Sequence, residues 1–127
     1  MDSELHLEAK KLENGDQVVF ITRHSPGYAE FMTIMQLVDL EQFHNVLEKI
    51  LKTDLSLRGL IDNPVDEKIG QDKWLVIRMD KSKSGNYYRS ARIESLGSGT
   101  NKRSKFWMNF TSLRPLCASI GKILKRK

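Results

Sequence analysis

The sequence predicts an α+β fold built from two copies of one unit, a strip of antiparallel β-strands followed by an amphipathic helix. Three observations lead to this prediction. Strand-like segments precede each of two helical segments, the two helical segments align with each other without a gap, and the chain divides into an acidic and a basic half. A chain of 127 residues can bury one core without disulfides or a metal.

Three strands are expected before the first helix. Residues 5–12 alternate apolar and polar side chains, residues 17–23 are rich in β-branched residues, and residues 31–38 form a third apolar run. The Asn-Gly pair at 14–15 predicts a hairpin between the first two strands, and Ser-Pro-Gly at 25–27 predicts a turn before the third.

The first helix is expected to begin at Asp39, which is a good N-cap residue, with Gln42 completing a capping box. Its apolar stripe repeats at helical spacing through Phe43, Val46, Leu47, Ile50 and Leu51. Residues 53–72 then have no strong periodicity, and we interpret them as a connector.

The second half repeats the order of the first. Strands are expected at 74–80, 86–95 and 105–110, separated by a Lys/Ser/Gly connector at 81–85 and a polar, glycine-containing loop at 96–104. A closing helix is expected to be capped by Ser112, with Pro115 in its first turn, where no intrahelical N–H is needed. Its apolar stripe is Leu116, Ile120, Ile123 and Leu124.

Direct alignment of the halves supports duplication. When Leu40 is placed on Leu113, six of 18 aligned positions are identical, where average composition gives about one. We therefore divide the chain into a first sheet-helix repeat at 1–52, a connector at 53–72 and a second repeat at 73–127, all within one compact unit. Short additional strands in the loops are allowed by this reading, and a βαββαβ ferredoxin-like arrangement is the alternative topology.

The net charge of +5 conceals a division between the halves. Residues 1–71 contain 7 Lys/Arg and 13 Asp/Glu, a net charge of −6, whereas residues 72–127 contain 14 and 3, a net charge of +11. A concentrated positive potential suits a polyanionic partner. A solvated basic surface without a partner is the alternative explanation.

Alternation along the second-half strands places aromatic and cationic side chains on the same sheet face, opposite the helices. Aromatic rings stack on unpaired bases while Arg and Lys meet phosphates, which is typical of single-stranded nucleic-acid binders. The candidate nucleic-acid contacts, including cations of the adjoining loops, are Trp74, Arg78, Lys81, Lys83, Tyr88, Arg92, Lys102, Arg103, Lys105 and Trp107.

One alternative concerns the face of the second half, and one further expectation concerns the face of the first half. The three aromatic residues among these candidates, Trp74, Tyr88 and Trp107, could instead pack against the first half or against a second copy of the chain. The equivalent face of the first half is expected to show Met32, Ile34 and Gln36, and therefore to be apolar and uncharged.

Catalytic and metal-binding patterns are weak. The three histidines are scattered, and none pairs with Cys117 at metal-ligand spacing. We expect Cys117 to belong to the core, and we expect no enzyme activity, cofactor or metal. No apolar run reaches the length of a membrane span, and an acidic start with a single cysteine favours an intracellular protein in cytoplasm, nucleus or nucleoid.

Two segments resemble a known group of proteins. Residues 32–43 run from an apolar strand into Leu-Glu-Gln-Phe at a helix start, and residues 84–89 read Ser-Gly-Asn-Tyr-Tyr-Arg. Both are similar to the Pur-alpha repeat, and the topology resembles Pur-alpha, the Whirly proteins and positive-cofactor-type transcriptional coactivators. The resemblance implies a curved antiparallel sheet with helices on one face, single-stranded DNA or RNA as ligand, a homodimer or higher oligomer, and a role in transcription, replication or RNA handling. The family has four strands per repeat, where the sequence shows three.

The sequence therefore predicts a non-enzymatic single-stranded nucleic-acid-binding protein that acts through the basic-aromatic face. The alternative is a protein-interaction or dimerisation module of the same fold that does not contact nucleic acid directly.

Overall fold

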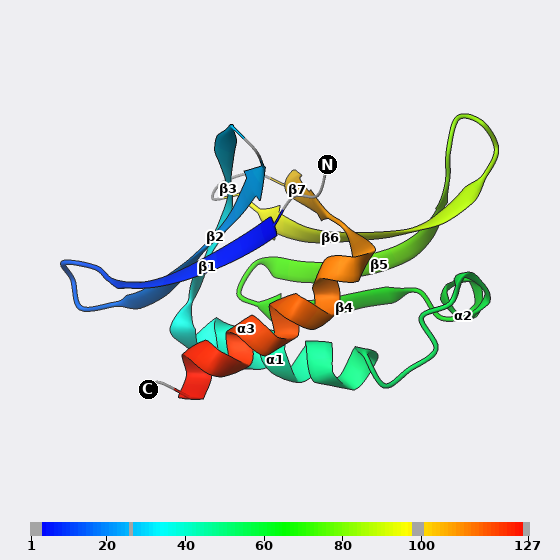
Figure 1. Ribbon diagram of the computed structural model, residues 1–127. Helices are drawn as coiled ribbons and strands as arrows, with labels where there is room; N and C mark the ends of the chain where they lie inside the picture. Colours follow the sequence, from blue (N-terminus) through cyan, green and yellow to red (C-terminus); the bar gives the residue numbers. More distant parts are fainter. Residues whose placement is uncertain (1–3, 26, 98–100, 126–127) are drawn as a thin grey trace.

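The computed structural model describes residues 4–25, 27–97 and 101–125. Within these ranges seven strands form two antiparallel sheets, and two long helices pack together against them (Figure 1). The first sheet is β1 (Glu4–Lys11), β2 (Gln17–Ser25) and β3 (Tyr28–Gln36), and the second is β4 (Val65–Gly70), β5 (Lys73–Lys81), β6 (Tyr87–Leu96) and β7 (Arg103–Met108). The helices are α1 (Leu37–Ile50), the short α2 (Leu57–Asp62) and α3 (Leu113–Lys125), which follows a 3₁₀ turn at Phe110–Ser112.

The two long hairpins have the same turn. The amide of Gly15 donates to the Leu12 carbonyl at 2.9 Å, and the amide of Gly85 donates to the Ser82 carbonyl at 3.0 Å. Gly15 and Gly85 have φ angles of 91° and 92°, which only glycine adopts readily. The hairpin predicted from Asn-Gly is confirmed, and the flexible connector expected at 81–85 is the matching turn of the second sheet.

The first helix begins at Leu37 with Gln36 as its N-cap, three residues before the predicted N-cap, because β3 runs directly into it. Asp39 is therefore not its N-cap but lies in the first turn, where its carboxylate accepts a hydrogen bond from the Gln71 amide at 3.4 Å. Gln42 does not close a capping box; its side-chain amide donates to the Lys68 carbonyl at 2.9 Å. Instead of capping their own helix, the two side chains bind the backbone of Lys68 in β4 and of Gln71 just after it.

The segment 53–72, interpreted as a connector, contains α2 and β4. β4 pairs with β5 through Val65 opposite Ile77, so the second sheet has four strands in the order β4-β5-β6-β7. Three consecutive strands before α1 exclude the βαββαβ alternative. The described chain is α+β, as predicted.

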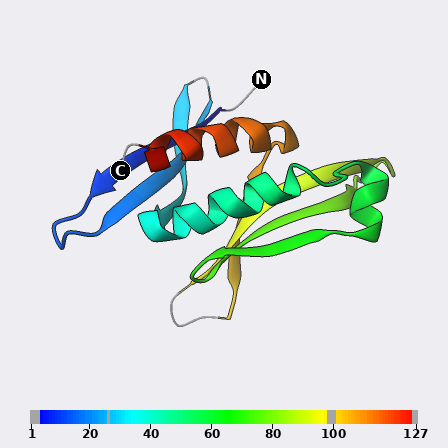
Figure 2. The same cartoon turned by 90° about the horizontal axis from the view of Figure 1, so that it is seen from below.

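One apolar core lies between the helices and both sheets (Figure 2). The inner faces of the sheets contribute the buried residues Val19, Ile21, Met35, Leu75, Ile77 and Ile93. The predicted helix stripes meet them, with Phe43, Leu47, Leu116 and Ile120 buried. Each such side chain stabilises the fold by about 1.5–3 kcal/mol. Among the helices of the described ranges, we find none with the length and apolarity needed to cross a bilayer.

Candidate functional site

The outer face of the second sheet, which is the side opposite α1 and α3, carries the aromatic and cationic side chains predicted from alternation. Register places two rows of side chains across this face: Trp74, Glu94 and Lys105, and Val76, Arg92 and Trp107. Residues in register point to the same side of a sheet. Leu75 and Ile93, which alternate with these residues, are buried on the inner face.

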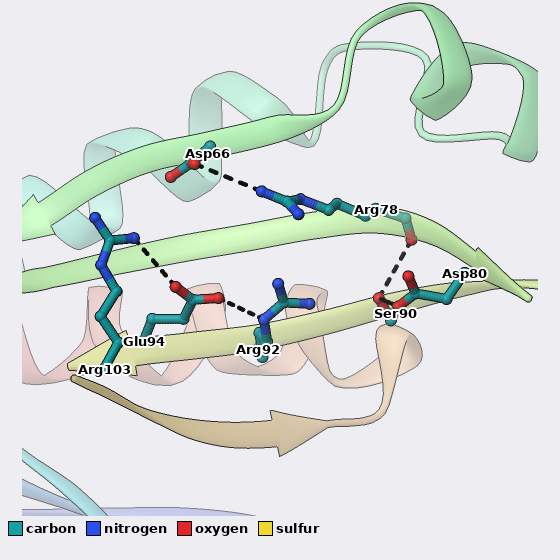
Figure 3. Close-up of polar contacts among 7 residues, drawn as sticks. All are labelled: Asp66, Arg78, Asp80, Ser90, Arg92, Glu94 and Arg103. Carbon is teal, nitrogen blue, oxygen red and sulfur yellow. Dashed lines mark hydrogen bonds and ion pairs between the residues drawn. The ribbon is translucent and has the colours of Figure 1, made fainter.

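Five side chains of the outer face form one continuous series of contacts. We call it the Trp–Arg–Glu–Arg–Trp series: Trp74, Arg103, Glu94, Arg92 and Trp107. The Arg103 guanidinium lies 3.8 Å from the Trp74 ring centre, and the Arg92 guanidinium lies 4.9 Å from the Trp107 ring centre. Glu94 accepts hydrogen bonds from Arg92 at 2.6 Å and from Arg103 at 3.1 Å, and Figure 3 shows it between the two.

The central pair of the series is buried although it lies on the outer face. Arg92 and Glu94 are each 6% exposed. Burial raises the pKa of Glu94, but the hydrogen bonds and positive charges of Arg92 and Arg103 outweigh it, and the pKa of Glu94 lies below its usual value. Glu94 is therefore a carboxylate that fixes both guanidinium groups.

The two tryptophans of the series differ in access. Trp107 is 46% exposed even though the Arg92 guanidinium lies over its ring. Trp74 is only partly exposed, and the guanidinium of Arg103 lies over its ring. An approaching aromatic group can stack directly on Trp107. At Trp74 it meets the plane of Arg103 first, and a guanidinium plane is itself a stacking surface.

Other predicted contacts lie along the outer face and at its hairpin end. Tyr88 is 48% exposed on this face, opposite Asp80. The guanidinium of Arg78 pairs with Asp66 of β4 at 3.8 Å. Lys81 turns toward the ring of Tyr87, 5.5 Å from its centre.

The loop cations are spread over two ends of the sheet. Lys83 is exposed in the β5–β6 turn, whereas Lys102 is exposed just before β7. Since β5 and β6 run antiparallel and Lys81 pairs with Tyr87 while Lys73 pairs with Ser95, these loops lie at opposite ends of the strands. The structure therefore brings eight of the ten predicted residues onto one sheet or its edge, and places the positive loops at either end.

β4 contributes residues to this face that were not predicted from the sequence. Lys68 pairs with Trp74, and Asp66 pairs with Val76, so both belong to the outer face. The signal that could have revealed β4 is the pair of apolar residues Val65 and Ile69, which share one face of an extended segment with polar residues between them. On the outer face the strand places one cation, Lys68, and one carboxylate, Asp66, so it adds no net charge there.

The outer face is less positive than the composition suggests. Its strand cations are Lys68, Arg78, Arg92, Arg103 and Lys105, and its carboxylates are Asp66, Asp80 and Glu94. Ion pairs compensate Arg78, Arg92 and Arg103. Lys68 and Lys105 have no side-chain partner among the described residues, and their charges are the ones available to an anionic ligand.

The outer face of the first sheet corrects one expectation. Ile34 lies on it, but it shares the face with Glu8 and Phe20 in direct register. Lys10 lies 5.3 Å from the ring centre of Phe20 and pairs with Glu8 at 3.8 Å. The face is therefore not uncharged; the side chain of Met32 lies outside those described.

The residues with catalytic potential do not converge. In the described ranges, no group of three or more His, Cys, Asp or Glu side chains is placed to hold a metal ion. Cys117 packs against the core, and burial together with the charge of Glu48 raises the pKa of its thiol. A raised pKa leaves the thiol protonated and poorly nucleophilic.

Comparison with known proteins adds no relative. No protein-family model matches the chain, and no curated protein matches its sequence.

Proposed function

We propose that the chain is a non-enzymatic single-stranded nucleic-acid-binding protein that holds DNA or RNA on the outer face of the second sheet. The observation that supports this most is the open ring of Trp107, 46% exposed and held on Arg92, beside Lys105 on the same strand. An exposed indole next to an uncompensated cation offers a base-stacking surface and a phosphate contact together.

The Trp–Arg–Glu–Arg–Trp series gives this surface a fixed shape. Glu94 holds both guanidinium groups; Arg92 supports the Trp107 indole, and Arg103 covers the Trp74 indole. Binding then orders few protein side chains, which lowers its entropic cost. In this proposal Trp107 and Tyr88 stack on bases, Arg103 presents its plane above Trp74, and Arg92 acts as a support because it is almost fully buried.

Phosphate contacts are assigned to the exposed lysines. Lys68 and Lys105 border the stacking surface on β4 and β7, and Lys83 lies at the hairpin turn. Arg78 can join them only by leaving Asp66, since the two are paired at 3.8 Å. Few free cations predict moderate affinity and a moderate salt dependence.

A titration of fluorescently labelled single strands of about 16 nucleotides at two salt concentrations tests the proposal. We expect binding that weakens with salt, with a slope of about −0.7 in log–log form for each phosphate contacted. A duplex of the same sequence should bind more weakly because its bases are not free to stack. Absence of binding at low salt would refute the proposal.

Adjacent tyrosines supply a matched control. Tyr88 and Tyr87 are 48% and 54% exposed but alternate between the outer and inner faces of β6. Tyr88→Ala should weaken binding about fivefold or more, whereas Tyr87→Ala should leave it nearly unchanged. Equal losses in both variants would move the site off the outer face.

A self-association module is the second candidate, favoured by a groove between α1 and α3. Its volume is about 890 Å³. The α1 side carries Glu41 and Glu48, and the α3 side carries Lys122 and Lys125. A second copy related by a two-fold axis would set acidic against basic residues. Sedimentation with and without a single strand separates the candidates: a dimer indifferent to nucleic acid favours this one.

A further inference from the structure

A separate pocket lies on the inner side of the second sheet, where β6 extends beyond the end of β7. The last residue pair of β7 is Met108 with Ala91, so Arg89 of β6 has no β7 neighbour. The pocket has a volume of about 450 Å³ and lies against the loop after α1 and the start of α3. Its polar lining residues are two arginines and three hydroxyl residues: Arg89, Arg114, Thr53, Ser56 and Thr111.

The guanidinium of Arg89 is held in a fixed position at this pocket. It lies 4.0 Å from the centre of the Phe110 ring, and its Nη1 donates to the Leu55 carbonyl at 3.3 Å. Stacking on Phe110 fixes the plane, and the single hydrogen bond leaves Nε and Nη2 as donors. The charge has no carboxylate opposite it in the pocket lining.

Arg114 brings a second positive charge to the same pocket. It is exposed, and no hydrogen bond or ion pair engages its side chain within the described ranges. The hydroxyl of Ser56 accepts from the Gly59 amide at 3.1 Å and is itself a hydrogen-bond donor to the Asp54 carboxylate, whose pKa it lowers. The neighbouring carboxylate of Asp54 is occupied by the Ser56 amide at 3.0 Å and lies against Gly59.

We propose that this pocket binds a phosphate group. Two guanidinium groups that line one pocket without a carboxylate in the lining favour an anion there, and arginine forks with hydroxyl donors match the oxygens of a phosphate. The lining offers donors from Arg89, Arg114 and the hydroxyl of Thr111, and contains no carboxylate to oppose the ligand.

The source of this phosphate is the backbone of the bound single strand, an assignment that rests on the proposed function. The chain passes from Trp107 on the outer face to Phe110 and Thr111 at the pocket within one short turn. A strand stacked on Trp107 can therefore pass the end of β7 and place a following phosphate between Arg89 and Arg114. The pocket would add affinity only for strands long enough to turn this edge.

Inorganic phosphate tests the pocket independently of nucleic acid. In ¹H–¹⁵N spectra at constant ionic strength, phosphate but not chloride should shift the amides of Ser56 and Thr111. The shifts should vanish in Arg114→Gln and persist in Arg58→Gln, a matched change at an exposed arginine of α2 that does not line the pocket. Absent or identical shifts in wild type and Arg114→Gln would overturn the site.

Oligonucleotides of two lengths test whether the phosphate in the pocket comes from the backbone of a bound single strand. Arg114→Gln should weaken binding of strands of about 16 nucleotides by about tenfold and reduce the salt slope by about 0.7, with no change for strands of about 4 nucleotides. Arg58→Gln should bind both lengths like wild type. Phosphate-induced shifts without an effect on the longer strand would assign the pocket to a small phosphate compound and overturn the backbone assignment.

Two further results keep this proposal separate from the proposed function. If wild type binds no oligonucleotide, the proposed function and the backbone assignment fail, while the phosphate spectra still decide the pocket. Because Arg114 also borders the groove between α1 and α3, its variant is examined by sedimentation. A changed oligomeric state in Arg114→Gln would assign the residue to that groove and contradict the pocket.

Discussion

The two sheets have similar inner faces and different outer faces. Both bury aliphatic side chains against the same helix layer, Val19 and Ile21 in the first sheet and Leu75 and Ile77 in the second. On the outer side, the first sheet pairs Lys10 with Glu8, while the second carries the Trp–Arg–Glu–Arg–Trp series. The inner faces meet the requirements of folding, so the difference between the outer faces is the informative one for function.

The second difference is whether the charged pair on each outer face is exposed or buried. Glu8 and Lys10 are exposed and 3.8 Å apart, a geometry that contributes little to stability. Glu94 and Arg92 are buried and 2.6 Å apart. A buried ion pair on a sheet face that is not covered by helices indicates a surface with a defined geometry.

The largest expected effect comes from weakening the helix layer that packs against both sheets. Phe43 is fully buried in α1, which contacts β4 of the second sheet and β2 and β3 of the first. Phe43→Ala should reduce the free energy of unfolding by about 3–5 kcal/mol. Amide hydrogen exchange should accelerate in both sheets together. Acceleration in only one sheet would show that the helix layer does not couple them.

Removal of the charge at the centre of the series comes next. Glu94→Gln leaves Arg92 buried without a counter-ion and should reduce the free energy of unfolding by about 1–3 kcal/mol at neutral pH. Glu8→Gln, the matched change on the first sheet, should alter it by at most about 0.5 kcal/mol. Urea unfolding measures both, and equal effects would contradict the distinction between the two outer faces.

Comparison of wild type with Glu94→Gln also predicts how stability depends on pH. Folding lowers the pKa of Glu94, so its contribution to stability is fully present above the unfolded-state value of about 4.3 and is lost as the pH falls through the lower folded-state value. The stability difference between wild type and Glu94→Gln should therefore be constant from pH 7 to about 5 and shrink below about 4. A difference that grows on acidification would reverse the assigned direction of the shift.

Removal of one ring from each outer face sharpens the comparison for binding. Trp107→Ala should weaken single-strand binding by about 1–3 kcal/mol. Phe20→Ala, on the outer face of the first sheet, should leave binding unchanged because that ring is partly buried under Lys10. Labelled-oligonucleotide titrations of both variants give the answer, and a loss caused by Phe20→Ala would extend the site to the first sheet.

The smallest effect concerns the two equivalent turns. Gly15→Ala and Gly85→Ala each place a side chain at φ near 90° without a close contact. Each should reduce stability by about 1–2 kcal/mol, and by similar amounts, because the strain is local to the turn. Thermal unfolding tests the equality. Markedly different losses would show that the two hairpins are not equivalent in structure.

Local periodicity accounts for most of what the sequence could predict. Spacing of Phe43, Leu47 and Ile50 predicted the buried side of α1, and alternation predicted that Trp107 and Leu75 lie on opposite faces. Both properties depend only on the periodicity of side-chain direction along a helix or a strand. The helix start at Leu37 was missed because Asp39 binds the Gln71 amide just after β4 and Gln42 binds Lys68 of β4, and no local rule contains these tertiary contacts.

Alternation predicted which face of the sheet carries the candidate residues, but it did not predict which of their charges form ion pairs or are buried. Alternation places Arg92 and Glu94 on one face, yet it gives no indication that they would be buried as a pair. The pair depends on Arg103 reaching across from β7, which is set by the register of two strands separated by a loop. β4 was missed because it is short and lies in a polar segment, and with it the contribution of Lys68.

The most direct measurement follows the two indole N–H signals of the protein during addition of a single strand. The chain has two tryptophans, both on the outer face of the second sheet, so each signal reports on one end of the series. We predict that the Trp107 indole signal shifts most, with smaller shifts at Trp74 and in the amides of β6 and β7, and none in β1–β3. Indole signals that stay in place while β1–β3 amides shift would contradict binding at this face.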